Sequence, residues 1–112
     1  MEIHELMIGD YVMVPSELNR IKRIQSTFDL DEASLYRPVP LSPEVLDAIG
    51  LERAFDLWTN ERIFIKLKGE EYLVEVNNPD GRISFFGTLS YLHQLQHVCS
   101  VCDAPRIIYN YE

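Results

Sequence analysis

Residues 62–86 decide the fold, and they read RIFIKLKGEEYLVEVNNPDGRISFF. Two runs of alternating apolar and polar residues flank a Gly-Glu pair at positions 69–70. A Gly-X pair between such runs is typical of a type II′ hairpin turn, in which glycine supplies the positive φ of the first central position. The cross-strand pairs that this turn predicts are Lys68 with Glu71, Leu67 with Tyr72, Ile65 with Val74, and Ile63 with Val76. One face of the hairpin is then entirely apolar.

A second turn follows at residues 78–81, where Asn-Pro-Asp-Gly is the composition of a type I turn closed by a left-handed glycine. The chain therefore returns as a third strand, and the three strands form an antiparallel meander. A three-residue loop here predicts the pairs Asn78 with Arg82, Val76 with Ser84, and Glu75 with Phe85.

This register also gathers apolar side chains on the second face of the meander, opposite the main apolar face. They are Phe64, Leu73, Ile83 and Phe85. We expect one of the helices to cover them, because helices on one side of an antiparallel sheet are a common α+β arrangement. If none does, the four residues are the candidate surface for a partner or for a second copy, since monomers seldom expose contiguous apolar area.

The rest of the chain alternates short strands with two helices. Ser42 is the expected N-cap of the first helix and Pro43 its first residue, because serine accepts a backbone hydrogen bond there and proline has no amide to lose. Residues 18–24 fit a strand or a helix, and we favour the strand. The expected strands cover residues 11–14, 18–24, 28–30, 55–58 and 106–111, and the expected helices cover residues 43–49 and 90–102.

The fold expected from these elements is a single α+β domain over residues 1–112. It begins with short antiparallel strands, which in one variant form a small barrel-like sheet. A short helix, the three-stranded antiparallel meander, a C-terminal helix and a final strand follow. A chain of 112 residues has the length of one domain with a modest core.

Charge and cysteine content limit the classes of function. Asp and Glu outnumber Lys and Arg by 18 to 10, which gives a net charge of −8. Such a field repels phosphate backbones and favours solubility or a basic protein partner. The sequence has neither a membrane-spanning segment nor a signal peptide at its first residues, and two cysteines favour reduced thiols. We expect a cytoplasmic protein without a membrane partner.

Four side chains that commonly bind zinc lie within ten residues, at His93, His97, Cys99 and Cys102. On one continuous helix, however, the histidines lie within about 40° of each other and the cysteines on the opposite, apolar side. We therefore expect no metal, both cysteines buried as free thiols, and His93 and Gln94 on the polar face. The Cys-x-x-Cys pair lies in the last helical turn, where the helix dipole opposes a thiolate, so redox chemistry is not expected.

Arg20, Lys22 and Arg23 form the basic cluster of the chain, with Tyr11 and Phe28 on neighbouring predicted strands. Small β-barrels bind single strands through basic and aromatic residues of this kind. Weak single-stranded nucleic-acid binding is therefore the alternative function. We expect it to be weak because only three cations face the phosphates in an acidic chain. Because no phosphate loop, nucleophile elbow or catalytic triad is present, we predict no catalytic residues and no cofactor.

Three segments, in the same order, carry a resemblance to a known family: residues 8–12 (IGDYV), 37–46 (RPVPLSPEVL) and 91–96 (YLHQLQ). They resemble small hypothetical proteins from Bacteroidetes-type genomes and their phages and mobile elements. No activity is assigned to that family, so the resemblance implies no catalytic residue. Residues 97–102 (HVCSVC) depart from the family pattern, in which aromatic and leucine residues lead to a glycine.

The function that we favour from the sequence is a non-enzymatic interaction or accessory module, encoded in one reading by a mobile element. Its partner is an unidentified protein or a second copy of the chain. Nucleic-acid binding through Arg20, Lys22 and Arg23 is the alternative. A metal-dependent enzyme that uses the two histidines and two cysteines of the C-terminal helix is a remote third.

Overall fold

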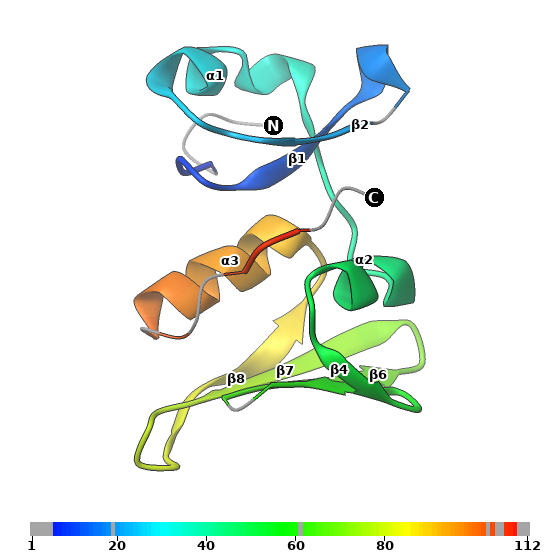
Figure 1. The fold of residues 1–112 in the computed structure, drawn as a ribbon, viewed down its shortest axis with the longest axis vertical. Helices are drawn as coiled ribbons and strands as arrows, with labels where there is room; N and C mark the ends of the chain where they lie inside the picture. The colour runs from blue at the N-terminus through cyan, green and yellow to red at the C-terminus, as the bar shows by residue number, and fades with distance from the viewer. Residues whose placement is uncertain (1–5, 19, 61, 103, 105–106, 110–112) are drawn as a thin grey trace. The chain divides into compact units, whose positions relative to one another are not determined.

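The computed structural model describes residues 6–18, 20–60, 62–102, 104 and 107–109 (Figure 1). Contacts between residues divide the chain into two compact units, Met1–Val39 and Pro40–Glu112. Each unit contains its own antiparallel sheet together with helices, which confirms the α+β class. The prediction of a single domain over residues 1–112 stays a prediction.

The first unit contains a three-stranded sheet with the order β2-β1-β3, formed by β1 (Tyr11–Val14), β2 (Arg20–Arg23) and β3 (Arg37–Pro38). The strand prediction for residues 18–24 is confirmed over β2. The three described strands form an open sheet and no closed barrel, so the barrel-like variant is wrong. The core of this unit contains Leu6, Val12, Val14, Ile24, Ala33 and Tyr36, with Leu30 packed against it.

Residues 28–30 are helical, which contradicts the predicted strand. They lie in α1 (Thr27–Asp31), and the 3-10 helices η2 (Pro15–Glu17) and η3 (Ala33–Leu35) complete the unit. Ser26 is the N-cap of α1, because its Oγ accepts a hydrogen bond from the Asp29 amide at 3.3 Å. The Asp29 carboxylate in turn accepts the Gln25 amide at 2.9 Å. These side-chain caps favour a helical turn over the alternation that suggested a strand.

The second unit is built on a five-stranded antiparallel sheet with the order β4-β5-β6-β7-β8. Its strands are β4 (Glu52–Ala54), β5 (Leu57–Thr59), β6 (Ile63–Lys68), β7 (Glu71–Asn77) and β8 (Ile83–Leu89). The predicted register of β6 and β7 is confirmed at every pair from Lys68–Glu71 to Ile63–Val76. Gly69 has the positive φ of +65° that the turn requires, and Gly81 closes the next loop at +87°.

The meander is longer than the sequence predicted. The expected strand at residues 55–58 begins only at Leu57, because Phe55 and Asp56 form the turn between β4 and β5. The final strand predicted for residues 106–111 is wrong over residues 107–109, which have no regular secondary structure. The remaining residues of that segment, 106, 110 and 111, lie outside the described residues.

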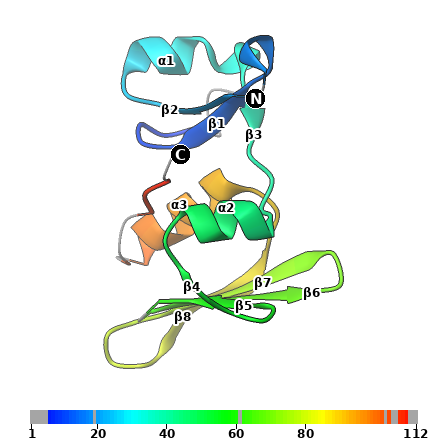
Figure 2. The ribbon, with the colours of Figure 1, turned by 45° about the vertical axis from the view of Figure 1, so that its right-hand side comes forward.

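Two helices cover one face of the five-stranded sheet, α2 (Pro43–Ala48) and α3 (Leu92–Val101) (Figures 1 and 2). The predicted N-cap of α2 is confirmed, since Ser42 Oγ accepts the Val45 amide at 3.2 Å. The side chains buried in this unit come from both helices and from the covered face of the sheet. They include Val45, Leu46, Ile49, Trp58, Ile63, Ile65, Tyr72, Val74, Val76, Leu92, Leu95 and Cys99.

Candidate interaction surface

Helix α2 is fixed to the sheet through a buried tryptophan. Trp58 on β5 is fully buried, and its Nε1 donates a hydrogen bond of 2.9 Å to Asp47 Oδ1 on α2. Arg53 on β4 lies over the Trp58 ring, 4.9 Å from the centroid, and pairs with Asp47 Oδ2 at 3.5 Å. This cluster holds α2 on the face of the sheet that carries Trp58, Ile65 and Val74.

Helix α3 is tied to the meander by Arg62. Its Nε donates a hydrogen bond of 2.7 Å to the Asn77 carbonyl, and its Nη2 donates one of 3.0 Å to the Cys102 carbonyl. The second bond satisfies one of the last carbonyls of the helix with a cation, where the helix dipole favours positive charge. With both helices held in this way, one face of the sheet is covered within the second unit.

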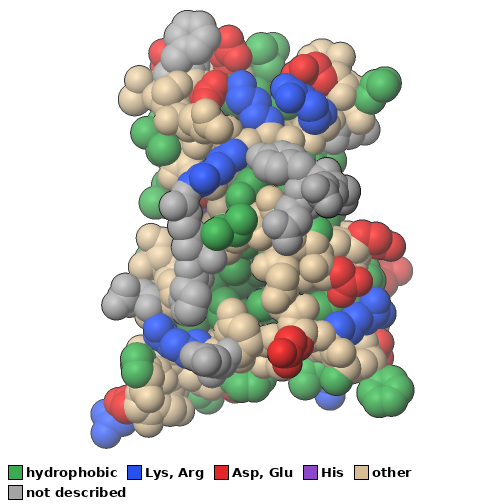
Figure 3. All heavy atoms as spheres, viewed as in Figure 1, with side chains coloured by type: hydrophobic (Ala, Val, Ile, Leu, Met, Phe, Trp, Pro, Cys, Tyr) green, Lys and Arg blue, Asp and Glu red, His purple; other side chains and the backbone are tan. Residues whose placement is uncertain are grey.

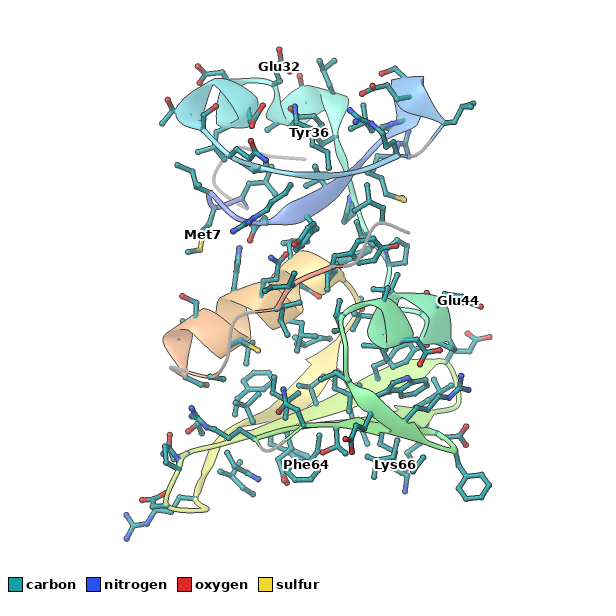
Figure 4. All side chains as sticks on the ribbon, viewed as in Figure 1. Met7, Glu32, Tyr36, Glu44, Phe64 and Lys66 are labelled. Atoms are coloured by element: carbon teal, nitrogen blue, oxygen red, sulfur yellow. The ribbon has the colours of Figure 1, made fainter. Side chains whose placement is uncertain are left out.

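The opposite face of the sheet carries apolar side chains that neither helix covers, and we call it the open face. Its apolar members are Leu57, Phe64, Leu73, Ile83 and Phe86. Figure 4 shows Phe64, with Lys66 beside it, on the side of the sheet away from α2 and α3. Ile83 is 60% and Phe86 65% exposed, while the others are half-buried. Hydrophobic side chains also line the lower border of the molecule in Figure 3.

The pairing predicted between β7 and β8 is wrong by one residue, and this changes one member of the surface. The predicted pair of Asn78 with Arg82 is present, since the Asn78 amide donates a hydrogen bond of 2.7 Å to the Arg82 carbonyl. A β-bulge beyond it skips Ser84, so that Val76 pairs with Phe85 and Glu75 with Phe86. An inserted residue moves every later side chain to the other face. Of the four predicted residues, Phe64, Leu73 and Ile83 therefore lie on the open face and Phe85 does not.

Phe85 lies instead on the covered face, where a glycine makes room for its ring. Gly87 pairs with Val74 on that face, and a Cβ on Gly87 would lie 3.2 Å from Phe85 Cζ. The sequence contains a signal for this arrangement that the alternation alone missed. An aromatic residue two positions before a glycine in a strand shares its face, and the missing side chain leaves space for the ring.

Phe55 is a further exposed aromatic residue that the sequence did not reveal. It occupies the first position of the two-residue turn between β4 and β5, with a φ of +56° and 95% exposure. Bulky side chains rarely adopt this left-handed conformation, which glycine normally supplies. No sequence rule predicts a phenylalanine there. Residues held in such sparsely populated backbone conformations cluster at functional sites.

The structure does not bring the three basic residues of β2 onto one face. Arg20 and Lys22 share one side of the strand, whereas Arg23 lies on the other. Arg20 pairs with Glu17 at 3.1 Å, and Lys22 pairs with Asp29 at 2.9 Å. Hydrogen bonds to Asp29 and Tyr36 raise the pKa of Lys22.

Of the two aromatic side chains expected beside this basic cluster, the structure describes that of Tyr11. Tyr11 is buried, with 2% of its surface exposed. The side chain of Phe28 lies outside the described residues. Single-stranded nucleic acid stacks on exposed aromatic rings, and the described ring of this pair is buried.

The polar face predicted for α3 is partly wrong. His93 is buried, with 6% exposed, because its ring stacks on Tyr91 with centroids 5.9 Å apart and meets the His97 ring edge-on at 5.6 Å. Gln94 has a capping role, since its Oε1 accepts the backbone amides of Ser90 and Tyr91 at 2.9 and 3.0 Å.

Cys99 and Cys102 are both free thiols, but only Cys99 is fully buried, so the predicted burial is wrong for Cys102. Burial raises the pKa of Cys99 to about 11, with a smaller contribution from the neighbouring Cys102. Cys102 is half-buried because the helix ends at Val101 and leaves it in the cap. Within the described ranges, no group of three or more His, Cys, Asp or Glu side chains is arranged to hold a metal ion.

No family model, curated protein or solved structure matches this chain. Among the helices formed by the described residues, none is long and apolar enough to cross a membrane.

Proposed function

We propose that this protein is a non-enzymatic interaction module of the cytoplasm that binds a protein partner through the open face of its five-stranded sheet. The observation that carries the proposal is the apolar character of that face, with Ile83 60% and Phe86 65% exposed. Exposed apolar patches of this kind mark interaction sites in folded proteins. Aromatic residues also dominate the binding energy of interfaces, and the open face contributes Phe64 and Phe86.

The charge of the chain indicates the chemistry of the partner. A net charge of −8 favours encounter with a protein that surrounds its apolar patch with basic residues. On the open face itself, Glu75 lies between Phe64 and Phe86 in the cross-strand row. A lysine or arginine at the centre of the partner patch would complement it.

A binding comparison between two variants of equal charge tests the proposal. Phe64→Asp places a carboxylate in the middle of the open face, whereas Ser34→Asp adds the same charge at an exposed position of η3 in the other unit. We expect a partner captured from the source cell by the wild-type chain to be retained by Ser34→Asp and lost by Phe64→Asp.

Circular dichroism of both variants checks that the fold survives. Because Phe64 is half-buried, Phe86→Asp at a more exposed position provides a second test of the same face. Retention of every captured partner by both open-face variants would contradict the proposal.

A further inference from the structure

The two edges of the five-stranded sheet differ in their protection against pairing. The β4 edge is three residues long and carries Glu52 and Arg53. The β8 edge is seven residues long, Ile83–Leu89, and contains no charged residue and no proline. Neither edge pairs with another strand among the residues that the structure describes. Proteins commonly blunt exposed edges with short strands, charges, prolines or bulges, and β8 has only the bulge at one end.

The distribution of charge makes β8 the place where two copies of the chain can approach. The whole chain carries −8, so surfaces with acidic side chains repel their own copies. Residues 83–102 contain no Asp, Glu, Lys or Arg. The strand that offers free backbone groups therefore lies in a long uncharged segment of an acidic protein.

β8 can also pair with β8 of a second copy in a register that brings compatible side chains together. The bulge disturbs the pleat at Ser84, so the regular part of β8 runs from Phe85 to Leu89. When a two-fold axis perpendicular to the sheet relates two antiparallel strands, the axis lies midway between two copies of the same residue. This follows because opposed side chains must lie on the same face. Full overlap of the regular part puts this axis at Gly87.

In this register, apolar side chains meet on the covered face and uncharged ones on the open face. Phe85 faces Leu89 of the second copy, and both lie on the covered face, as their pairs with Val76 and Tyr72 show. Phe86 faces Thr88 of the second copy on the open face. No like charges oppose each other in any pair.

We infer that the protein forms a homodimer in which β8 pairs antiparallel with β8 of a second copy, about a two-fold axis at Gly87. The two five-stranded sheets then become one continuous sheet. Because the axis is perpendicular to the sheet, both open faces lie on the same side and form one larger surface. The inference concerns the edge of the sheet and stands independently of the partner proposed for the open face.

A charge-swap experiment on the full chain tests the register. One variant carries Phe86→Lys and Thr88→Lys, and the other carries Phe86→Glu and Thr88→Glu. The introduced side chains of like charge face each other across the axis in each homodimer. In sedimentation equilibrium, we expect the wild type to approach twice the 13.0 kDa of one chain and to dissociate on dilution. Each variant alone should be monomeric, and an equimolar mixture of the two should dimerise.

Two controls separate the edge from other surfaces. Ala54→Lys adds a lysine to the opposite edge, on β4, and should leave the dimer intact. Phe64→Asp alters the open face without touching β8 and should also leave it intact, so loss of a partner and loss of the dimer can be told apart. A monomeric wild type at every concentration would overturn the inference. So would a dimer that resists the lysine pair in β8, or one that Phe64→Asp dissociates.

Discussion

Cys99 and Cys102 differ in accessibility, although they lie only three positions apart, Cys99 within α3 and Cys102 at its C-cap. Cys99 is 2% exposed and has a pKa raised to about 11 by burial, while Cys102 is half-buried. At pH 8, a thiol of that pKa is about 0.1% thiolate, which is the reactive form. We expect iodoacetamide to label Cys102 first. Labelling of Cys99 should be at least about tenfold slower and should accelerate as the pH rises toward 11.

Mass spectrometry of the Cys99→Ser and Cys102→Ser variants assigns the two rates. Labelling in urea provides the control, because unfolding exposes both thiols and should make the rates similar. Equal rates in the folded protein would contradict the burial of Cys99. The burial itself followed from the helical spacing of Cys99 with Leu92 and Leu95, whereas the exposure of Cys102 depends on where the helix ends.

The hairpin of β4 and β5 is strained at its turn. Phe55 adopts a φ of +56° and is 95% exposed. Its ring therefore buries little apolar surface that could offset the backbone strain. Replacement by glycine should relieve the strain, and replacement by alanine should remove the ring but keep the Cβ that causes it. We expect Phe55→Gly to be more stable than Phe55→Ala by about 1 kcal/mol in urea unfolding.

The same pair of variants separates stability from binding. If Phe55 contacts a partner, both variants lose affinity equally, because both lack the ring. If the left-handed backbone has no effect on stability, Phe55→Gly and Phe55→Ala will unfold at the same urea concentration, and the strain argument fails.

The elements that sequence reasoning predicted are those determined by short-range chemistry. The turn glycine at 69 determined the β6–β7 register, and Ser42 with Pro43 determined the start of α2. The bulge at Ser84 was missed because loop length alone does not reveal an inserted residue further along the strand. α1 was missed because Leu30 and its acidic neighbours alternate like a strand, while the caps at Ser26 and Asp29 favour a helix.

At the scale of the whole molecule, the candidate surface depends on which face the helices cover. Alternation along β6 and β7 predicted two faces and placed Phe64 and Leu73 on the second. The expectation that a helix would cover this second face is wrong, because α2 is held on the other face by contacts such as Trp58 with Asp47. Such contacts join residues from separate elements, and no pattern within one element records them.

The net charge of −8 makes a final prediction about the dimer. Two copies repel each other over their acidic surfaces, whereas β8 contributes no charge to the paired edge. Adding sodium chloride shortens the Debye length from about 30 Å at 0.01 M to about 10 Å at 0.1 M, which weakens this repulsion. We therefore expect the dissociation constant measured by sedimentation equilibrium to fall as salt rises over this range. An interface held by ion pairs would show the opposite trend, so a dissociation constant that rises with salt would exclude the uncharged edge of β8 as the contact between the two chains.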